Sequence, residues 1–146
     1  MRATPCIGIC STTYGDLVCR GCKRFAHEIV AWNTYAPAQR DRVWRRLFEL
    51  RDEATARFVV VVDERALRDT ARVHRIEVRE DASALTVGYE ILRRRARDIA
   101  SLRDVGMDAL PGDRRTALEL RDAIDAEFHL RSVAHYEHSF RVLVDS

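Results

Sequence analysis

The sequence predicts a mainly α-helical protein with an N-terminal four-cysteine metal knuckle, a helical domain after it, and one short two-stranded β element. Two observations lead to this fold class. Apolar residues recur at helical spacing in several segments, and all 4 cysteines lie between Cys6 and Cys22. Because 146 residues suffice for one domain with its own core, we expect a single structural unit. Within it, residues 1–50 form the metal motif with two helices, and residues 51–146 form the helical remainder packed on it.

The cysteines form two close pairs, C-x3-C and C-x2-C: Cys6 with Cys10, and Cys19 with Cys22. Two such pairs are typical of structural zinc sites, where each pair binds one side of a tetrahedral ion. Iron–sulfur clusters use the same thiolates, so the spacing predicts a four-cysteine metal site without choosing the metal. Two disulfides in a secreted domain are the alternative. Because no signal-peptide pattern precedes Pro5, we expect reduced thiols and a cytoplasmic protein instead.

The residues around the cysteines predict a turn followed by a helix. Gly15-Asp16 is a turn signal, so a tight hairpin or loop over residues 11–18 would fold the two pairs back onto each other. A helix over residues 23–35 is predicted by one apolar stripe, Phe25, Ile29 and Trp32. Cys22 would then lie at the start of that helix, where free N–H groups favour thiolates. This order of elements is similar to that of treble-clef zinc sites.

Three pieces of this segment carry a family resemblance: Pro5-Cys6-x-Gly8-x-Cys10, Asp16-Leu17-x-Cys19-Arg20-Gly21-Cys22, and Glu28-Ile29-x-x-Trp32. Over about residues 5–50 the chain resembles the YdhL-like bacterial family (domain of unknown function 1289), whose members are described as predicted iron–sulfur proteins. The resemblance implies no activity, and it implies four metal ligands, Cys6, Cys10, Cys19 and Cys22. The family commonly has Ser before the next helix. Since this chain has Ala36 there, we expect the N-cap hydrogen bond to be missing.

The remainder of the chain predicts further helices and one β pairing. Pro37 begins a helix that runs to about Ala56, and Phe58–Val62 is sufficiently β-branched for a short strand. The alternating segment 75–79 is the expected partner of that strand. Three more helices are expected, namely 64–74 after an Asp63 cap, a long one from Asp81 or Ser83 to about Val105, and one to about Ser139 after an Asp113 cap.

Charge is distributed unevenly, although the net charge is only +2. Basic side chains outnumber acidic ones in residues 1–50. A basic face near the cysteines would meet a protein partner or an RNA, and its expected members are Arg20, Lys23, Arg24, Arg42, Arg45 and Arg46. The alternative is a solvated charged coat. No apolar run approaches the ~20 residues that cross a bilayer, so we expect no membrane partner.

No residue pattern predicts catalysis. The sequence has no G-x-S-x-G, phosphate loop, dinucleotide fingerprint or H-E-x-x-H motif. His27 is a candidate replacement ligand, and His135-x-x-His138 is a candidate second metal site, with bystander roles as the alternative for all three. We therefore expect a small four-cysteine metal-binding protein that is not an enzyme and acts as a zinc-stabilised binding or adaptor module. The alternative is an iron–sulfur cluster protein with a redox or sensor role.

Overall fold

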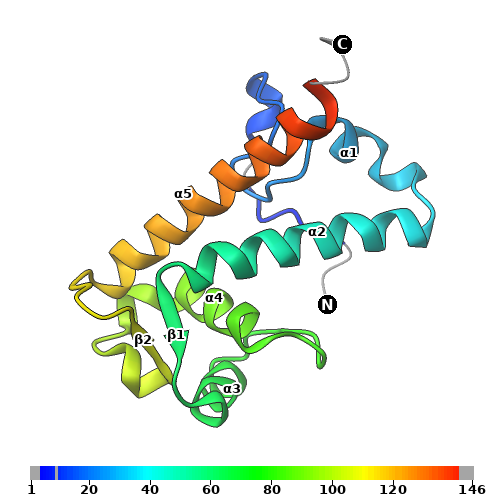
Figure 1. Cartoon of the computed structure of the whole chain (residues 1–146). Coiled ribbons are helices and arrows are strands. Elements are labelled where there is room, and N and C mark those ends of the chain that lie inside the picture. Colours follow the sequence, from blue (N-terminus) through cyan, green and yellow to red (C-terminus); the bar gives the residue numbers. More distant parts are fainter. Residues whose placement is uncertain (1–3, 9, 142–146) are drawn as a thin grey trace. The chain divides into compact units, whose positions relative to one another are not determined.

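The computed structural model describes residues 4–8 and 10–141, and it confirms the mainly helical class (Figure 1). The chain forms two compact units. Among the described residues, the central unit comprises Arg51–Ala126, and the terminal unit comprises residues 4–8, 10–50 and 127–141. Two long helices, α2 (Pro37–Ala56) and α5 (Ala117–Tyr136), contribute residues to both units.

In the terminal unit, the helix expected over residues 23–35 begins later than its apolar stripe indicates. Helix α1 spans Ala26–Ala31, and a 3-10 turn, Trp32–Thr34, follows it. Lys23 has a left-handed backbone with φ 67°, and Phe25 is extended with φ −74° and ψ 149°. The expected start at Lys23 is wrong because the backbone of Lys23 closes the preceding cysteine turn and cannot also begin a helix.

Helix α2 (Pro37–Ala56) has the predicted bounds. Ala36 offers no side-chain oxygen to cap it, as expected from the sequence. The backbone N–H of Ala36 nevertheless donates to Oε1 of Gln39 at 2.7 Å, which is the reciprocal half of a capping box. The start of α2 thus retains one of the two hydrogen bonds that a Ser cap would give.

The central unit contains the small sheet, and its pairing differs from the prediction. Strands β1 (Val59–Val61) and β2 (Met107–Ala109) are antiparallel, with Val60 opposite Asp108 (Figure 1). The expected pairing of β1 with residues 75–79 is wrong. The N–H of Ile76 donates to the carbonyl of Ala71 at 2.8 Å, so this segment closes the end of α3 (Glu64–Val73) instead.

Of the two remaining helices of the central unit, α4 (Ala84–Arg95) is shorter than predicted and α3 has nearly the predicted bounds. Helix α4 has the expected Ser83 cap, but it is followed by two 3-10 turns, Ala96–Asp98 and Leu102–Val105. Helix α3 begins as predicted, because the Asp63 side chain accepts from the Ala66 N–H at 3.1 Å.

Helix α5 begins at Ala117, and its cap is Thr116 rather than the predicted Asp113. The N–H of Glu119 donates to Thr116 Oγ1 at 3.1 Å, and the Thr116 N–H donates to Glu119 Oε1 at 3.1 Å. This capping box outcompetes Asp113, which accepts from the Arg115 N–H. A π-helical turn, Glu137–Arg141, follows α5, and residues 142–144 of the unassigned tail lie outside the described residues.

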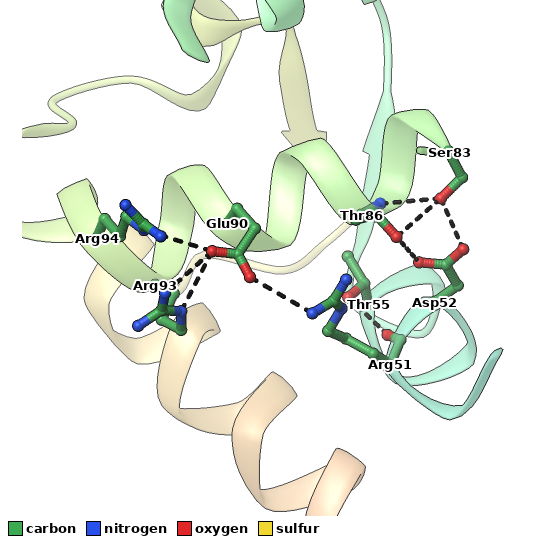
Figure 2. A network of polar contacts seen from close by, with 8 residues as sticks. All are labelled: Arg51, Asp52, Thr55, Ser83, Thr86, Glu90, Arg93 and Arg94. Atoms are coloured by element: carbon green, nitrogen blue, oxygen red, sulfur yellow. Dashed lines mark hydrogen bonds and ion pairs between the residues drawn. The ribbon is translucent and has the colours of Figure 1, made fainter. Parts of the chain in front are cut away.

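A polar network joins the end of α2 to α4 inside the central unit (Figure 2). The buried carboxylate of Glu90 accepts from Arg51 of α2 at 3.4 Å and from Arg93 of its own helix at 3.1 Å. Burial, opposed by the charge of Arg51 4.8 Å from the ring centroid, raises the pKa of Tyr89 to about 12. One turn away, Asp52 accepts from the hydroxyl of Thr86 at 2.7 Å. These bonds specify how the end of α2 faces α4, since Arg51, Thr86 and Glu90 are buried.

Gly106 is predicted to be the position in the central unit least tolerant of a side chain. It has φ +86°, and an added Cβ would meet the Asp63 carbonyl and, at 2.8 Å, the Leu67 nitrogen. Gly112 has nearly the same backbone, φ +85°, with nothing within 4 Å of an added Cβ. Gly112→Ala should therefore cost only the left-handed penalty of about 1–2 kcal/mol, and Gly106→Ala roughly 1–3 kcal/mol more.

Urea unfolding followed by far-ultraviolet circular dichroism measures both changes. Equal losses for Gly106→Ala and Gly112→Ala would contradict the close approach of Gly106 to the backbone of Asp63 and Leu67.

Candidate metal centre

The second cysteine pair lies at the tip of a short backbone hairpin. The Cys19 N–H donates to the Arg24 carbonyl at 2.9 Å, and the Lys23 N–H donates to the Cys19 carbonyl at 2.9 Å. An antiparallel bridge between Val18 and Phe25 continues the pairing toward α1. The chain therefore folds back around the C-x2-C pair itself. Of the hairpin or loop expected over residues 11–18, the hairpin is wrong, because Ser11–Tyr14 is a 3-10 helix. The predicted turn is present, since this helix ends at Gly15 with φ 97°.

Hydrogen bonds converge on the sulfurs of this turn. Burial opposes ionisation of Cys19, but backbone N–H groups of Cys22, Ser11 and Gly21 outweigh it and lower the pKa of the thiol. At Cys22 burial dominates and raises the pKa, although Nε of Arg24 donates to the sulfur at 3.3 Å. Such donors spread the charge of a thiolate, which is the form that binds metals.

The first cysteine pair is less enclosed. Cys6 and Cys10 are both half-buried. The Gly8 N–H lies 3.4 Å from the Cys6 sulfur, and the Thr12 hydroxyl lies 3.0 Å from the Cys10 sulfur. Hydrogen bonds from Thr12 and Thr13 lower the pKa of Cys10, and desolvation and then the negative charge of Cys19 oppose them.

The four thiols are not gathered around one point. Within residues 4–8 and 10–141, no group of three or more His, Cys, Asp or Glu side chains is placed to hold a metal ion. The structure brings together Cys19 and Cys22, and it leaves Cys6 in its own loop. The four-cysteine ligand set therefore stays a prediction.

Half of the predicted basic face lies in the interior. Lys23 is 0% exposed and Arg24 4%, while the Arg46 side chain is 15% exposed. The remaining members, Arg20, Arg42 and Arg45, are exposed. The prediction that all six cations share a solvent-facing surface is wrong. In a sequence a buried cation is indistinguishable from a solvated one, because burial depends on contacts that the charge pattern does not contain.

Arg46 is buried because it pairs with Glu28, which sequence reasoning left without a role. Both terminal nitrogens of Arg46 bond the Glu28 carboxylate at 2.6 Å, and that carboxylate also accepts from the Phe25 N–H at 2.8 Å. The Arg46 guanidinium lies 4.0 Å from the centroid of the Phe25 ring. Glu28 stands three residues after the cap position of α1, and this spacing would have revealed its role had the helix start been known.

Phe25 is the centre of an aromatic cluster that joins distant parts of the sequence. It is 1% exposed. Its ring centroid lies 5.1 Å from that of Tyr136 and 5.6 Å from that of Phe140. His135 stacks on the same ring at 6.2 Å. The C-terminal end of α5 therefore covers the residue at which the chain leaves the cysteine turn.

The histidines singled out from the sequence belong to this cluster. The ring of His27 lies 5.1 Å from Phe140 and 5.8 Å from Phe25. Partial desolvation and then the positive charge of Arg46 lower the pKa of His135, and Glu28 opposes them. His138 contributes a further positive influence on His135. These contacts are those of aromatic packing, and the predicted second metal site lacks a third ligand among the described residues.

Comparison with known families identifies the N-terminal segment. Residues 4–51 match the profile described as "Protein of unknown function (DUF1289)". This segment belongs to the DUF1289 family. The match confirms the predicted family, though not the narrower YdhL-like name, and it contains both cysteine pairs and all of α1. No significant match was found among curated proteins or among solved structures.

The DUF1289 segment is completed here by residues outside the matched range. The Phe25 ring is covered by Tyr136 and Phe140. In addition, the Lys23 ammonium lies 5.5 Å from the ring centroid of Phe128 on α5. Across the described part of the chain, no helix combines the length and apolarity needed to cross a bilayer.

Glu28→Gln is predicted to lower the free energy of unfolding of the terminal unit by roughly 3 kcal/mol, because it leaves the buried Arg46 charge without its carboxylate. Both tryptophans of the chain, Trp32 and Trp44, lie in this unit, so their fluorescence during urea unfolding reports on it selectively.

Asp16→Asn is the matched control for Glu28→Gln. It removes an acid from the exposed pair with Arg20, whose side chains are 40% and 72% exposed, and should cost less than about 1 kcal/mol. Equal effects of the two substitutions would show that the Glu28–Arg46 pair is not enclosed as described.

Proposed function

We propose that the DUF1289 segment binds one metal through the thiolates of Cys6, Cys10, Cys19 and Cys22, and that the metal-stabilised unit acts as a binding or adaptor module. The observation that carries this proposal is the construction of the C-x2-C turn. Backbone N–H groups of Gly21 and Cys22 donate to the Cys19 sulfur, and a guanidinium donates to the Cys22 sulfur. Donors directed at sulfur favour the thiolate form over the thiol, and metals bind the thiolate.

The four cysteines fit a bound metal ion in their ligand chemistry and in their sequence spacing. Cys19 and Cys22 supply one pair in the C-x2-C turn, and Cys6 and Cys10 supply the second pair, half-buried in the preceding loop. For all four thiolates to bind one ion, the loop of Cys6 and Cys10 must close onto the turn. A bound ion would cross-link these loops, because they are far too short to form a hydrophobic core of their own.

We propose zinc as the bound metal in preference to an iron–sulfur cluster. A hairpin that bears one cysteine pair and leads directly into a helix is an arrangement typical of structural zinc sites. The alternative is an iron–sulfur protein with a redox or sensor role, since the same thiolates serve both. With the metal in a structural role we assign no catalysis, and thiols that must stay reduced suit the cytoplasm.

A protein partner is favoured over an RNA. Lys23, Arg24 and Arg46, which would have formed half of a phosphate-binding face, are enclosed in the unit. Its solvent-exposed side chains include apolar ones, Tyr14 at 90%, Leu17 at 58% and Val30 at 85%. Apolar and aromatic exposure is more typical of contacts with proteins than with a phosphate backbone.

The purified reduced protein is predicted to contain about one equivalent of zinc and to be colourless. Elemental analysis and an absorption spectrum after anaerobic purification without chelator test this. A brown protein with about four equivalents of iron would favour the cluster. Less than half an equivalent of zinc and iron together would contradict metal binding altogether.

Cys19→Ser with Cys22→Ser should abolish metal binding, whereas His27→Ala should retain it, since the His27 ring packs among aromatic rings. Loss of the metal in His27→Ala would make this histidine a ligand.

Removal of the metal with a strong chelator is predicted to leave most of the helical signal in far-ultraviolet circular dichroism. Helices α2, α3, α4 and α5 lie outside the cysteine loops and have apolar contacts of their own. Fluorescence of Trp32 should change, because the Arg24 guanidinium next to the Cys22 sulfur lies 4.9 Å from the Trp32 ring centroid. Complete unfolding on chelation would contradict this independence.

A further inference from the structure

Two buried cations directly follow the C-x2-C pair. Lysine and arginine side chains are almost never fully buried unless they are paired, because an enclosed charge is costly. Yet Lys23 is 0% exposed and Arg24 is 4% exposed. The residues that each contacts indicate what these charges do.

Lys23 forms hydrogen bonds to backbone carbonyl groups of the cysteine turn. Its ammonium donates to the carbonyl of Arg20 and, at 3.1 Å, to the carbonyl of Gly21. In a trans peptide the C=O and the N–H point in opposite directions. The Arg20 carbonyl and the Gly21 N–H belong to one peptide group, and the Gly21 carbonyl and the Cys22 N–H belong to the next. These are two of the N–H groups that donate to the Cys19 sulfur.

The ammonium therefore acts on the Cys19 sulfur through two peptide groups. By holding the carbonyls it orients the N–H groups toward the sulfur, and its charge polarises each peptide in the direction that strengthens an N–H···S⁻ bond. The left-handed backbone of Lys23, φ 67°, returns its side chain over the turn that its own N–H closes.

Arg24 acts on the other sulfur of the pair directly. Its Nε donates to the Cys22 sulfur at 3.3 Å, and its guanidinium lies 4.9 Å from the Trp32 ring centroid. Each sulfur of the C-x2-C pair thus has one buried cation near it. Lys23 acts on the Cys19 sulfur through two peptide groups, and Arg24 acts on the Cys22 sulfur through a direct hydrogen bond.

We propose that Lys23 and Arg24 are positioning residues that balance the charge of the Cys19 and Cys22 thiolates and so raise the affinity of the centre for metal. This rests on the proposed function, because the thiolate charge that they balance is that of a metal-bound pair. Removal of a side chain that orients a metal ligand typically weakens metal binding 10–100-fold.

The test measures Co²⁺ binding to the reduced, metal-free protein under anaerobic conditions. Lys23→Met keeps the apolar stem and the same left-handed backbone cost, and Arg24→Gln keeps a polar group beside the sulfur. We expect each to weaken Co²⁺ binding about 10–100-fold. The sulfur-to-cobalt charge-transfer bands should move to longer wavelength, because the thiolates become richer in electrons.

Arg20→Met is the matched control. Arg20 lies inside the same turn and bears the same charge, but its side chain is 72% exposed and paired with Asp16. Solvent screens it, so the affinity should change by less than about threefold and the bands should not move. An equal effect of Arg20→Met would show that net charge alone matters, which would overturn the proposal.

Lys23→Gly separates the role of the side chain from that of the backbone. Glycine adopts the left-handed conformation without strain, so this variant closes the turn readily even where Lys23→Met fails to fold. We expect it to bind Co²⁺ as weakly as Lys23→Met. Wild-type affinity in Lys23→Gly would overturn the role of the ammonium.

The outcomes distinguish this inference from the function on which it rests. Failure of the wild-type protein to bind Co²⁺ or Zn²⁺ would overturn the proposed function and this inference with it. Wild-type binding with unchanged affinity and unchanged bands in both Lys23→Met and Arg24→Gln would overturn this inference alone.

Discussion

Closure of the C-x2-C turn is the constraint on which the rest of the terminal unit depends. The backbone of Lys23 becomes left-handed so that its N–H can reach the Cys19 carbonyl. The chain then leaves the turn extended at Phe25, which delays the start of α1 and directs the Phe25 ring inward. From this start, Glu28 is placed to bond the Phe25 N–H and to pair with Arg46 on α2. One backbone closure thus determines a helix start, a buried ion pair and the centre of an aromatic cluster.

The sequence predicted the elements whose signals are local. The start of α2 follows from Pro37, and the cap of α3 follows from Asp63. Elements that depend on distant residues were missed. Strand β2 has a Met-Asp-Ala sequence without β-branched residues and exists because it pairs with β1, while Gly106 provides the close approach to α3. Local propensity cannot report such pairing, because the stabilising atoms lie elsewhere in the chain.

The positions of the basic side chains were likewise not predictable from local sequence. In sequence, Lys23, Arg24 and Arg46 resemble Arg42 and Arg45, and all five were assigned to one solvent-facing surface. Three of them instead have acceptors inside the unit, namely turn carbonyls, a cysteine sulfur and a carboxylate. A count of cations therefore described how much charge the segment carries and not where it acts. Glu28, the acidic residue that accepts from Arg46, lies within the matched segment.

The DUF1289 segment does not contain all of its own core. The Lys23 ammonium lies over Phe128, and the Phe25 ring is covered by Tyr136 and Phe140. A chain that ended near residue 51 would expose both an aromatic ring and a lysine stem directly beside the cysteine turn, at a cost in apolar burial. The segment therefore needs a cover, which α5 supplies here. Because Phe128 and Tyr136 of α5 contact the two residues that close and follow the turn, substitutions at these positions would act on the cysteine turn through Lys23 and Phe25.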